Sequence, residues 1–202
     1  MLVYLLRHGE TDWNKEKRIQ GCTDIPINEY GRELARKTRD GLRDTEFDLC
    51  LCSPLGRARE TASIVLEDRN VPIEICDAVR EMNFGEYEGL PSSEEPMKTI
   101  WYDFFHDTEN YVASKTGESV EELLARAGEF LAHLSSSPDY QDKRILVSTH
   151  GAAMTAMINQ IKGETGVAKF WQMGVPKNCA VTTVTYENGA WRILEENRVF
   201  YE

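Results

Sequence analysis

The sequence predicts an α/β fold with a mostly parallel central sheet and a C-terminal hairpin. Three short apolar runs span residues 2–6, 47–52 and 145–147. They lack the alternation of apolar and polar residues that marks a strand with one face exposed to solvent. Such runs are typical of strands buried on both faces, as in the middle of a parallel sheet. Near the C-terminus, Asn188-Gly189 lies between two further strand-like runs, which indicates a hairpin.

The first run ends at Arg7-His8-Gly9-Glu10, so a guanidinium and an imidazole directly follow a buried strand. In open α/β sheets, ligands bind at the carboxyl ends of the strands. Residues 11–27 are expected to form a loop. Asn28 is then a plausible N-cap for a helix that runs to about Arg43.

The second run is followed by Ser53-Pro54, and a Ser N-cap with Pro at the first helical position is a strong helix start. The helix that follows would carry Arg57 in its first turn, where free backbone N–H groups attract anions. A short third strand, entered through Pro72, is expected over residues 71–76.

Residues 91–116 are acidic and rich in aromatic side chains. They are predicted to form a helical insertion over the sheet edge and the active site there, with the aromatics mainly filling the core. Ser119 and Glu122 form a capping box that opens the next helix. The third apolar run ends at Thr149-His150-Gly151 and leads into a helix that reaches about Ile161.

Composition narrows the class of protein. The 23 Lys and Arg against 34 Asp and Glu give a net charge of −11, which argues against a nucleic-acid or membrane-surface partner. No stretch approaches the length that spans a bilayer, and the first run is too short for a signal peptide. The five scattered cysteines form no disulfide framework, so a reduced, cytoplasmic protein is expected. No repeat or linker is visible, which predicts one domain over residues 1–202.

Parallel strands end at one edge of a sheet, so the groups after the three runs are expected to meet in one pocket. These groups are Arg7, His8, Arg57 and His150. Two guanidinium forks beside two imidazoles suit a phosphate dianion. Taken singly, each has an ordinary explanation, because a His after a strand is often structural and Arg often pairs with acidic side chains.

A metal site is a third explanation for these histidines. It would use His8, His150 and a carboxylate such as Glu10 or Glu81. Arg7 beside His8 disfavours it, because a guanidinium would repel a cation.

Six motifs run in a fixed order over nearly the whole chain. They are Leu6-Arg7-His8-Gly9-Glu10-Thr11 with Asn14, then Gln20-Gly21-Cys22-Thr23-Asp24-Ile25-Pro26, Ser53-Pro54-Leu55-Gly56-Arg57-Ala58 with Thr61-Ala62, Glu81-Met82-Asn83-Phe84-Gly85 with Glu88-Gly89, Gly117-Glu118-Ser119, and Thr149-His150-Gly151. This set resembles the histidine phosphatase superfamily, also called phosphoglycerate mutase-like. The resemblance implies a three-layer α/β/α sandwich that forms a single histidine phosphatase domain.

The resemblance also implies a role for each matching residue. His8 would be the nucleophile and would carry a phosphoryl group on one ring nitrogen, which requires that the other nitrogen keep its proton. Glu81 would protonate the leaving oxygen and then activate water, with Glu86 and Glu88 as rival acids. The phosphoryl oxygens would be ringed by Arg7, Arg57 and His150, and the pocket completed by Asn14, Gln20 and the Gly21 backbone.

Hydrolysis of a small phosphorylated metabolite is the predicted reaction. The chain would be a metal-independent phosphoric monoester hydrolase without a cofactor, as a monomer or homodimer. The family's cofactor-dependent mutases have a longer insertion, a C-terminal tail and more basic residues, whereas residues 92–116 offer only Lys98 and Lys115. The alternative is a bisphosphoglycerate-dependent phosphoglycerate mutase. A non-catalytic scaffold is a weaker alternative, because scaffolds usually lose part of the His-Arg-Glu-His set.

Three polar residues are expected to lie outside the chemistry. His133 should face solvent, because its helical position is about 125° from the apolar stripe. His106 is expected at the surface, and Glu10 is expected to stabilise a loop.

Overall fold

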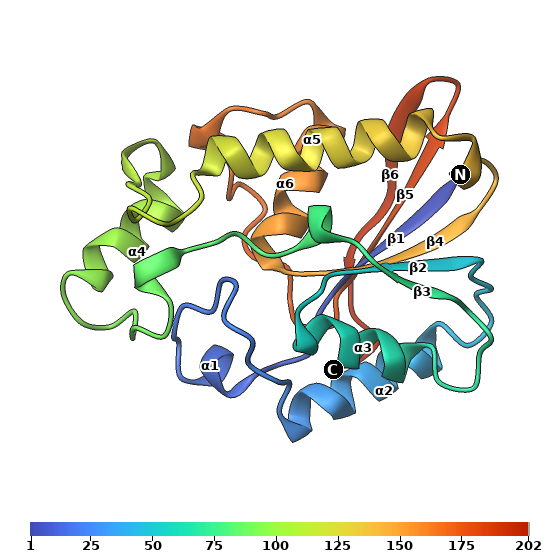
Figure 1. Cartoon of the computed structure of the whole chain (residues 1–202), viewed down its shortest axis with the longest axis horizontal. Coiled ribbons are helices and arrows are strands. Elements are labelled where there is room, and N and C mark those ends of the chain that lie inside the picture. The colour runs from blue at the N-terminus through green and yellow to red at the C-terminus, as the bar shows by residue number, and fades with distance from the viewer. Residues whose placement is uncertain (202) are drawn as a thin grey trace.

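A six-stranded sheet in the order β3-β2-β4-β1-β5-β6 forms the centre of the computed structural model, which describes residues 1–201 (Figure 1). The strands are β1 Leu2–Arg7, β2 Leu49–Cys52, β3 Ile73–Ile75, β4 Arg144–Thr149, β5 Val181–Glu187 and β6 Ala190–Arg198. β1 to β4 are parallel, whereas β5 runs antiparallel to β1, and β6 returns along β5. The predicted mostly parallel sheet with a C-terminal hairpin is confirmed.

Helices cover both faces of this sheet. The α-helices are α1 Asp12–Lys15, α2 Glu29–Gly41, α3 Gly56–Val65, α4 Met97–His106, α5 Val120–Ser136 and α6 Gly151–Lys162. Short 3₁₀ turns are η1 Asp77–Val79, η2 Gly85–Tyr87, η3 Thr108–Asn110, η4 Pro138–Tyr140 and η5 Val167–Lys169. α2 and α3 lie on one face, and α5 and α6 lie on the other (Figure 1). The three-layer α/β/α sandwich is therefore confirmed.

β1 is buried on both faces, as its unbroken apolar run predicts. Val3 and Leu5 belong to the core under α5 and α6, whereas Leu6 belongs to the core under α2 and α3. All three side chains have 0% exposure, and burial of each contributes roughly 1.5–3 kcal/mol. Packing from both sides fixes the position of the residues that follow β1.

Two helices begin at the N-cap residues that the sequence predicts. The Asn28 side chain accepts a hydrogen bond from the Gly31 N–H at the start of α2. Ser119 and Glu122 form the predicted capping box at the start of α5. In the hairpin, Asn188 and Gly189 have φ values of 52° and 79°, the left-handed conformation that such a tight turn requires.

The start of α3 differs from the prediction. Ser53 does not cap this helix; Leu55 occupies the N-cap position and offers no side-chain acceptor. The carboxylate of Asp24 accepts from the Gly56 N–H at 2.7 Å instead. The Ser53 hydroxyl instead accepts from the Leu55 N–H at 3.3 Å and lies 2.7 Å from the Nε2 of His150, which links the end of β2 to the polar site.

The predicted loop over residues 11–27 contains the short helix α1. Thr11 and Asn14 form a capping box there, because the Thr11 hydroxyl accepts from the Asn14 N–H and the Asn14 side chain accepts from the Thr11 N–H. The prediction was wrong on this turn because a single capped turn has no apolar periodicity to detect.

α4 lies within the aromatic-rich segment 91–116, beyond the carboxyl ends of the parallel strands (Figure 1). Its Phe104 is 1% exposed and belongs to the core, as expected for these aromatics. His106 and His133 are exposed, which confirms their predicted positions. Over residues 1–201, no helix is long and apolar enough to cross a membrane.

Candidate active site

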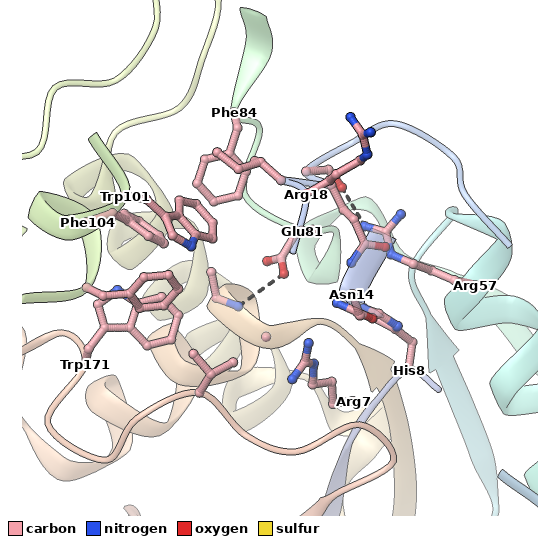
Figure 2. A pocket seen from close by; sticks show the side chains of 17 residues that line it. Arg7, His8, Asn14, Arg18, Arg57, Glu81, Phe84, Trp101, Phe104 and Trp171 are labelled. Atoms are coloured by element: carbon pink, nitrogen blue, oxygen red, sulfur yellow. Dashed lines mark hydrogen bonds between the residues drawn. The ribbon is translucent and has the colours of Figure 1, made fainter. Parts of the chain in front are cut away.

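The groups after β1, β2 and β4 meet at one edge of the sheet. Arg7 pairs in register with Thr149, and the His8 N–H donates to the Thr149 carbonyl at 3.0 Å. Arg57 enters from the first turn of α3 with 0% exposure. Figure 2 shows Arg7, His8 and Arg57 on one side of a single pocket. The predicted convergence of these side chains is present.

The ring of His8 is held by its own neighbour. Nδ1 lies 2.7 Å from the carbonyl oxygen of Gly9, and the ring is 2% exposed. A carbonyl oxygen only accepts, so Nδ1 carries the proton and Nε2 keeps its lone pair. Burial, and then the charges of Arg57 and Arg7, lower the pKa of His8 well below its usual value. The ring is therefore neutral at pH 7, with Nε2 unprotonated.

Arg57 is fixed by three acceptors. Its Nε donates to the Nδ1 of His150 at 3.2 Å, and its two terminal nitrogens donate to the carbonyls of Thr23 at 2.8 Å and Gly21 at 2.5 Å. Burial lowers its pKa, and the nearby carboxylates of Glu81 and Asp24 act against that effect.

Arg7 is held by the segment that precedes β5. One terminal nitrogen donates to the carbonyl of Pro176. Its Nε is buried and has no hydrogen-bond partner among residues 1–201. A buried, unpaired donor of this kind is costly unless a ligand accepts from it. Two guanidiniums that line one pocket, one with an unused N–H, form a cradle for an anion.

Asn14 and Gln20 line the pocket, and their side-chain NH₂ groups donate to no other residue within 1–201. Asn14 Oδ1 accepts from the Thr11 N–H at 3.2 Å, and Gln20 Oε1 accepts from the Thr11 hydroxyl at 2.7 Å. The carbonyl end of each amide is thus occupied, which leaves its NH₂ end to donate to an anion. Gly21 also lines the pocket, with φ at +56° and no room for a Cβ atom.

Glu81 lies at the N-terminus of α6 with 8% exposure. Its carboxylate accepts from the backbone N–H groups of Met82 at 2.9 Å, Ala153 at 3.0 Å and Ala152 at 3.2 Å. These three donors fix the orientation of the carboxylate. Among the described residues that line the pocket, Glu81 is the one acid.

The rival acids have other partners. The Glu88 carboxylate accepts from the N–H groups of Cys22 at 2.8 Å, Thr23 at 2.7 Å and Phe84 at 3.1 Å, and so ties two loops together. Glu86 is exposed. Glu10 accepts from the side chain of Asn28 at 3.0 Å, as expected for a loop-stabilising carboxylate.

His150 lies behind the pocket wall. It has 0% exposure, and its ring centroid is 5.1 Å from that of His8. Nδ1 accepts from Arg57, so Nε2 carries the proton and donates to Ser53 Oγ. Burial, and then Arg57 and His8, lower the pKa of His150 well below its usual value. Both ring nitrogens are thus occupied, and His150 is not among the lining residues.

Sequence reasoning missed several residues of this pocket. The aromatic side chains of Trp101, Phe104, Phe105 and Trp171 line its far end. The Asn178 side chain donates to the His8 carbonyl at 3.1 Å and to Asn14 Oδ1 at 3.3 Å. A run of aromatic residues in a sequence does not reveal which rings face a pocket. Asn178 lies in a loop with no recognisable pattern.

No group of three or more His, Cys, Asp or Glu within residues 1–201 could hold a metal ion. The metal-free expectation stays a prediction. The five cysteines are free thiols.

The sandwich and its pocket define an α/β protein with two guanidiniums and a histidine at the carboxyl ends of its parallel strands. The chain belongs to the histidine phosphatase superfamily (branch 1), whose family model matches residues 3–199.

Phosphatases stand among its relatives. The uncharacterized phosphatase PhoE of Bacillus subtilis is 33% identical, over 96% of this chain and 93% of its own. The adenosylcobalamin/alpha-ribazole phosphatase of Escherichia coli is 32% identical over 100% of this chain and 99% of its own. The probable phosphoglycerate mutase GpmB of Enterobacter sp. is 30% identical over 94% of this chain and 86% of its own. The solved structure of Bacillus stearothermophilus YhfR superposes with a TM-score of 0.90 at 30% identity, covering 98% of this chain and 97% of that one.

Proposed function

We propose that this chain is a metal-independent phosphatase that hydrolyses a small phosphomonoester through a phosphohistidine on His8. The observation that carries the proposal is the 2.7 Å contact between His8 Nδ1 and the Gly9 carbonyl. It leaves Nε2 as an unprotonated nucleophile on a ring that lines the pocket beside two guanidiniums.

In the first step, the lone pair of His8 Nε2 attacks phosphorus and the bond from phosphorus to the ester oxygen breaks. The departing oxygen takes a proton from Glu81. Arg7 and Arg57 stabilise the charge on the equatorial oxygens, which is the main demand of phosphoryl transfer. The free Nε–H of Arg7 and the unused amide N–H groups of Asn14 and Gln20 support this role.

In the second step, water attacks the phosphohistidine. Glu81, now a carboxylate, takes a proton from that water, and the bond from phosphorus to nitrogen breaks with its electron pair returning to Nε2. The three N–H groups that hold Glu81 support both steps, because they keep its carboxyl group in a fixed position in the pocket.

His150 supports the cradle through Arg57 in this proposal. Its Nδ1 holds the guanidinium Nε at 3.2 Å. The sequence implied that it would touch the phosphoryl oxygens directly; a positioning role fits its two occupied nitrogens better.

A mutase is the second candidate, because GpmB is among the relatives. The pocket argues for hydrolysis, since neither Lys98 nor Lys115 is among its lining residues. Assays with 3-phosphoglycerate, in the presence and absence of 2,3-bisphosphoglycerate, decide between them. Bisphosphoglycerate-dependent interconversion faster than phosphate release would reject the phosphatase.

The direct test of the proposed function is phosphate release from 4-nitrophenyl phosphate. The wild type should release phosphate at the same rate with and without EDTA, and His8→Ala should be inactive with an unchanged circular dichroism spectrum. Activity retained by His8→Ala would reject the proposal, and loss of activity in EDTA would reject its metal-independent form.

The wider setting also belongs to this proposal. The family match over residues 3–199 supports a single domain over residues 1–202, with residues 91–116 over the active site. The free thiols support a reducing, cytoplasmic location.

A further inference from the structure

The carbonyl that orients the ring of His8 belongs to a glycine, the residue with the widest backbone freedom. Gly9 has no side chain that could fix its own position. None could be added either, because a Cβ atom on Gly9 would lie 2.7 Å from the carbonyl oxygen of Gly31. The 2.7 Å contact between His8 Nδ1 and the Gly9 carbonyl therefore depends on other groups that hold the Gly9 backbone.

One of these groups is the side chain of Thr61 in α3. Its Oγ1 accepts from the Gly9 N–H at 2.9 Å. The same hydroxyl donates its one proton to the carbonyl of Arg57 at 2.7 Å, which leaves its lone pairs to accept from Gly9. Thr61 has 0% exposure and Gly9 is buried, so bulk water cannot replace either hydrogen bond.

The other side of the same peptide group is held from the segment before β5. The carbonyl of His8 accepts from the side-chain NH₂ of Asn178 at 3.1 Å and from the N–H of Cys179 at 3.3 Å. The peptide group between His8 and Gly9 thus has its oxygen bound on one side and its N–H bound by Thr61 on the other. Rotation of this peptide group would move the Gly9 carbonyl relative to the His8 ring.

We propose, on the basis of the phosphatase function above, that Thr61 is a positioning residue for the nucleophile. It keeps the Gly9 carbonyl against Nδ1 of His8, and so keeps the ring proton on that nitrogen. Without this carbonyl the imidazole can hold its proton on Nε2, where it blocks attack on phosphorus. Because the same hydroxyl binds the carbonyl of Arg57, Thr61 also ties the nucleophile to the helical turn that carries one guanidinium of the cradle.

NMR of the protein with nitrogen-15-labelled histidine measures the His8 tautomer without any substrate. The His8 signals are those missing from His8→Ala, and the wild type should carry the proton on Nδ1. Thr61→Val removes the hydroxyl and nearly keeps the shape of the side chain. It should move the proton toward Nε2, seen as converging nitrogen-15 shifts of the two ring nitrogens. Thr61→Ser keeps the hydroxyl and should restore the wild-type shifts. Wild-type shifts in folded Thr61→Val would overturn the proposal.

Thr155→Val in α6 is the matched control. Thr155 is also a buried helical threonine, and its hydroxyl donates to the carbonyl of Gly151 one turn earlier in its own helix, at 2.9 Å. kcat/KM for 4-nitrophenyl phosphate should fall roughly tenfold or more in Thr61→Val, where a buried N–H loses its acceptor, and by less than about threefold in Thr61→Ser and Thr155→Val. Equal losses in Thr61→Val and Thr155→Val would count against the positioning role.

The NMR measurement separates this inference from the phosphatase function, because it needs no turnover. If the wild type hydrolyses no ester, the phosphatase function fails, yet a shifted tautomer in Thr61→Val would still support the positioning role. An unchanged tautomer in Thr61→Val would reject that role even in an active phosphatase. If Thr61→Val does not fold, Thr61→Cys replaces it, since a thiol is a weaker acceptor of similar size.

Discussion

The Nε of Arg57 lies 3.2 Å from the Nδ1 of His150, and this contact fixes the roles of both residues. A guanidinium can only donate, so His150 accepts at Nδ1 and directs its own proton from Nε2 to Ser53 Oγ at 2.7 Å. Ser53, His150 and Arg57 thus form a series of hydrogen bonds that ends at the pocket. These hydrogen bonds link the end of β2 to the end of β4, and both strand ends are fixed by the sheet.

His150→Ala should weaken anion binding through Arg57. Loss of a hydrogen bond to a charged group costs about 1.5–3 kcal/mol, so the inhibition constant of inorganic phosphate should rise roughly 10- to 100-fold. kcat/KM should fall as the affinity for phosphate falls. The control is His133→Ala, an exposed position, which should change neither value. Unchanged phosphate affinity in folded His150→Ala would contradict the positioning role.

The buried histidines should make stability depend on pH. The pKa values of His8 and His150 are both well below 6.5 in the folded chain. As the pH falls below about 6.5, the unfolded chain binds protons that the folded chain does not, so the free energy of unfolding falls. The decrease can reach about 1.4 kcal/mol per pH unit for each ring.

Urea unfolding between pH 7.5 and 5.0 measures this slope, in a range above the usual titration of carboxylates. His106→Gln and His133→Gln should leave it unchanged, because both side chains are exposed. A free energy of unfolding that does not change between pH 7 and 5 would show that the two buried rings bind protons in the folded state as readily as in the unfolded chain, which contradicts their lowered pKa values.

Glu81→Gln should act selectively on substrates with poor leaving groups. An alkoxide must be protonated as it departs, whereas 4-nitrophenolate departs without help. General acid catalysis typically contributes about 10²- to 10⁴-fold, so the variant should lose that much more kcat on alkyl phosphates than on 4-nitrophenyl phosphate in the first step. The measurement is single-turnover release of each alcohol. Equal losses for both substrates would assign the acid to another group.

Glu88→Gln should impair the site without touching substrate. Its carboxylate holds the N–H groups of Cys22 and Thr23 in the loop whose carbonyls bind Arg57. An amide in its place leaves at least one N–H unpaired, which costs about 1–3 kcal/mol of the free energy of unfolding.

kcat/KM for Glu88→Gln should fall by a similar factor for all phosphate esters, because the cradle itself shifts. Glu86→Gln is the matched control in the same loop, since Glu86 is exposed. A loss that depends on the leaving group, as expected for Glu81, would instead make Glu88 an acid in the reaction.

The sequence predicted the sheet because β1 and β4 are apolar on both faces, and that pattern has few other causes. It predicted the convergence of Arg7, His8 and Arg57 because parallel strands end at one edge. It did not reveal that the Ser53 side chain contacts His150 and does not cap α3, since a Ser before a Pro is also a typical helix cap. The choice between these two partners depends on a residue 97 positions away.

The aromatic lining of the pocket could not be predicted from the sequence for a related reason. Phe104 and Trp101 lie on one helix three residues apart, yet Phe104 is buried and Trp101 is half-buried at the pocket. Trp171 joins them from a segment far along the chain. Both rings line the pocket, and packing against α4 decides how much of each stays exposed, which no local sequence pattern encodes.

The central claim is that His8 Nε2 carries the phosphoryl group, and trapping the phosphoenzyme tests it most directly. The wild type is mixed with excess 4-nitrophenyl phosphate, quenched in base within the first turnovers and mapped by peptide mass spectrometry. Phosphorus-31 NMR of the labelled peptide then tells which nitrogen is modified. The account predicts an acid-labile phosphoryl group on His8 at Nε2. Label on any other side chain, or on Nδ1 of His8, would contradict it.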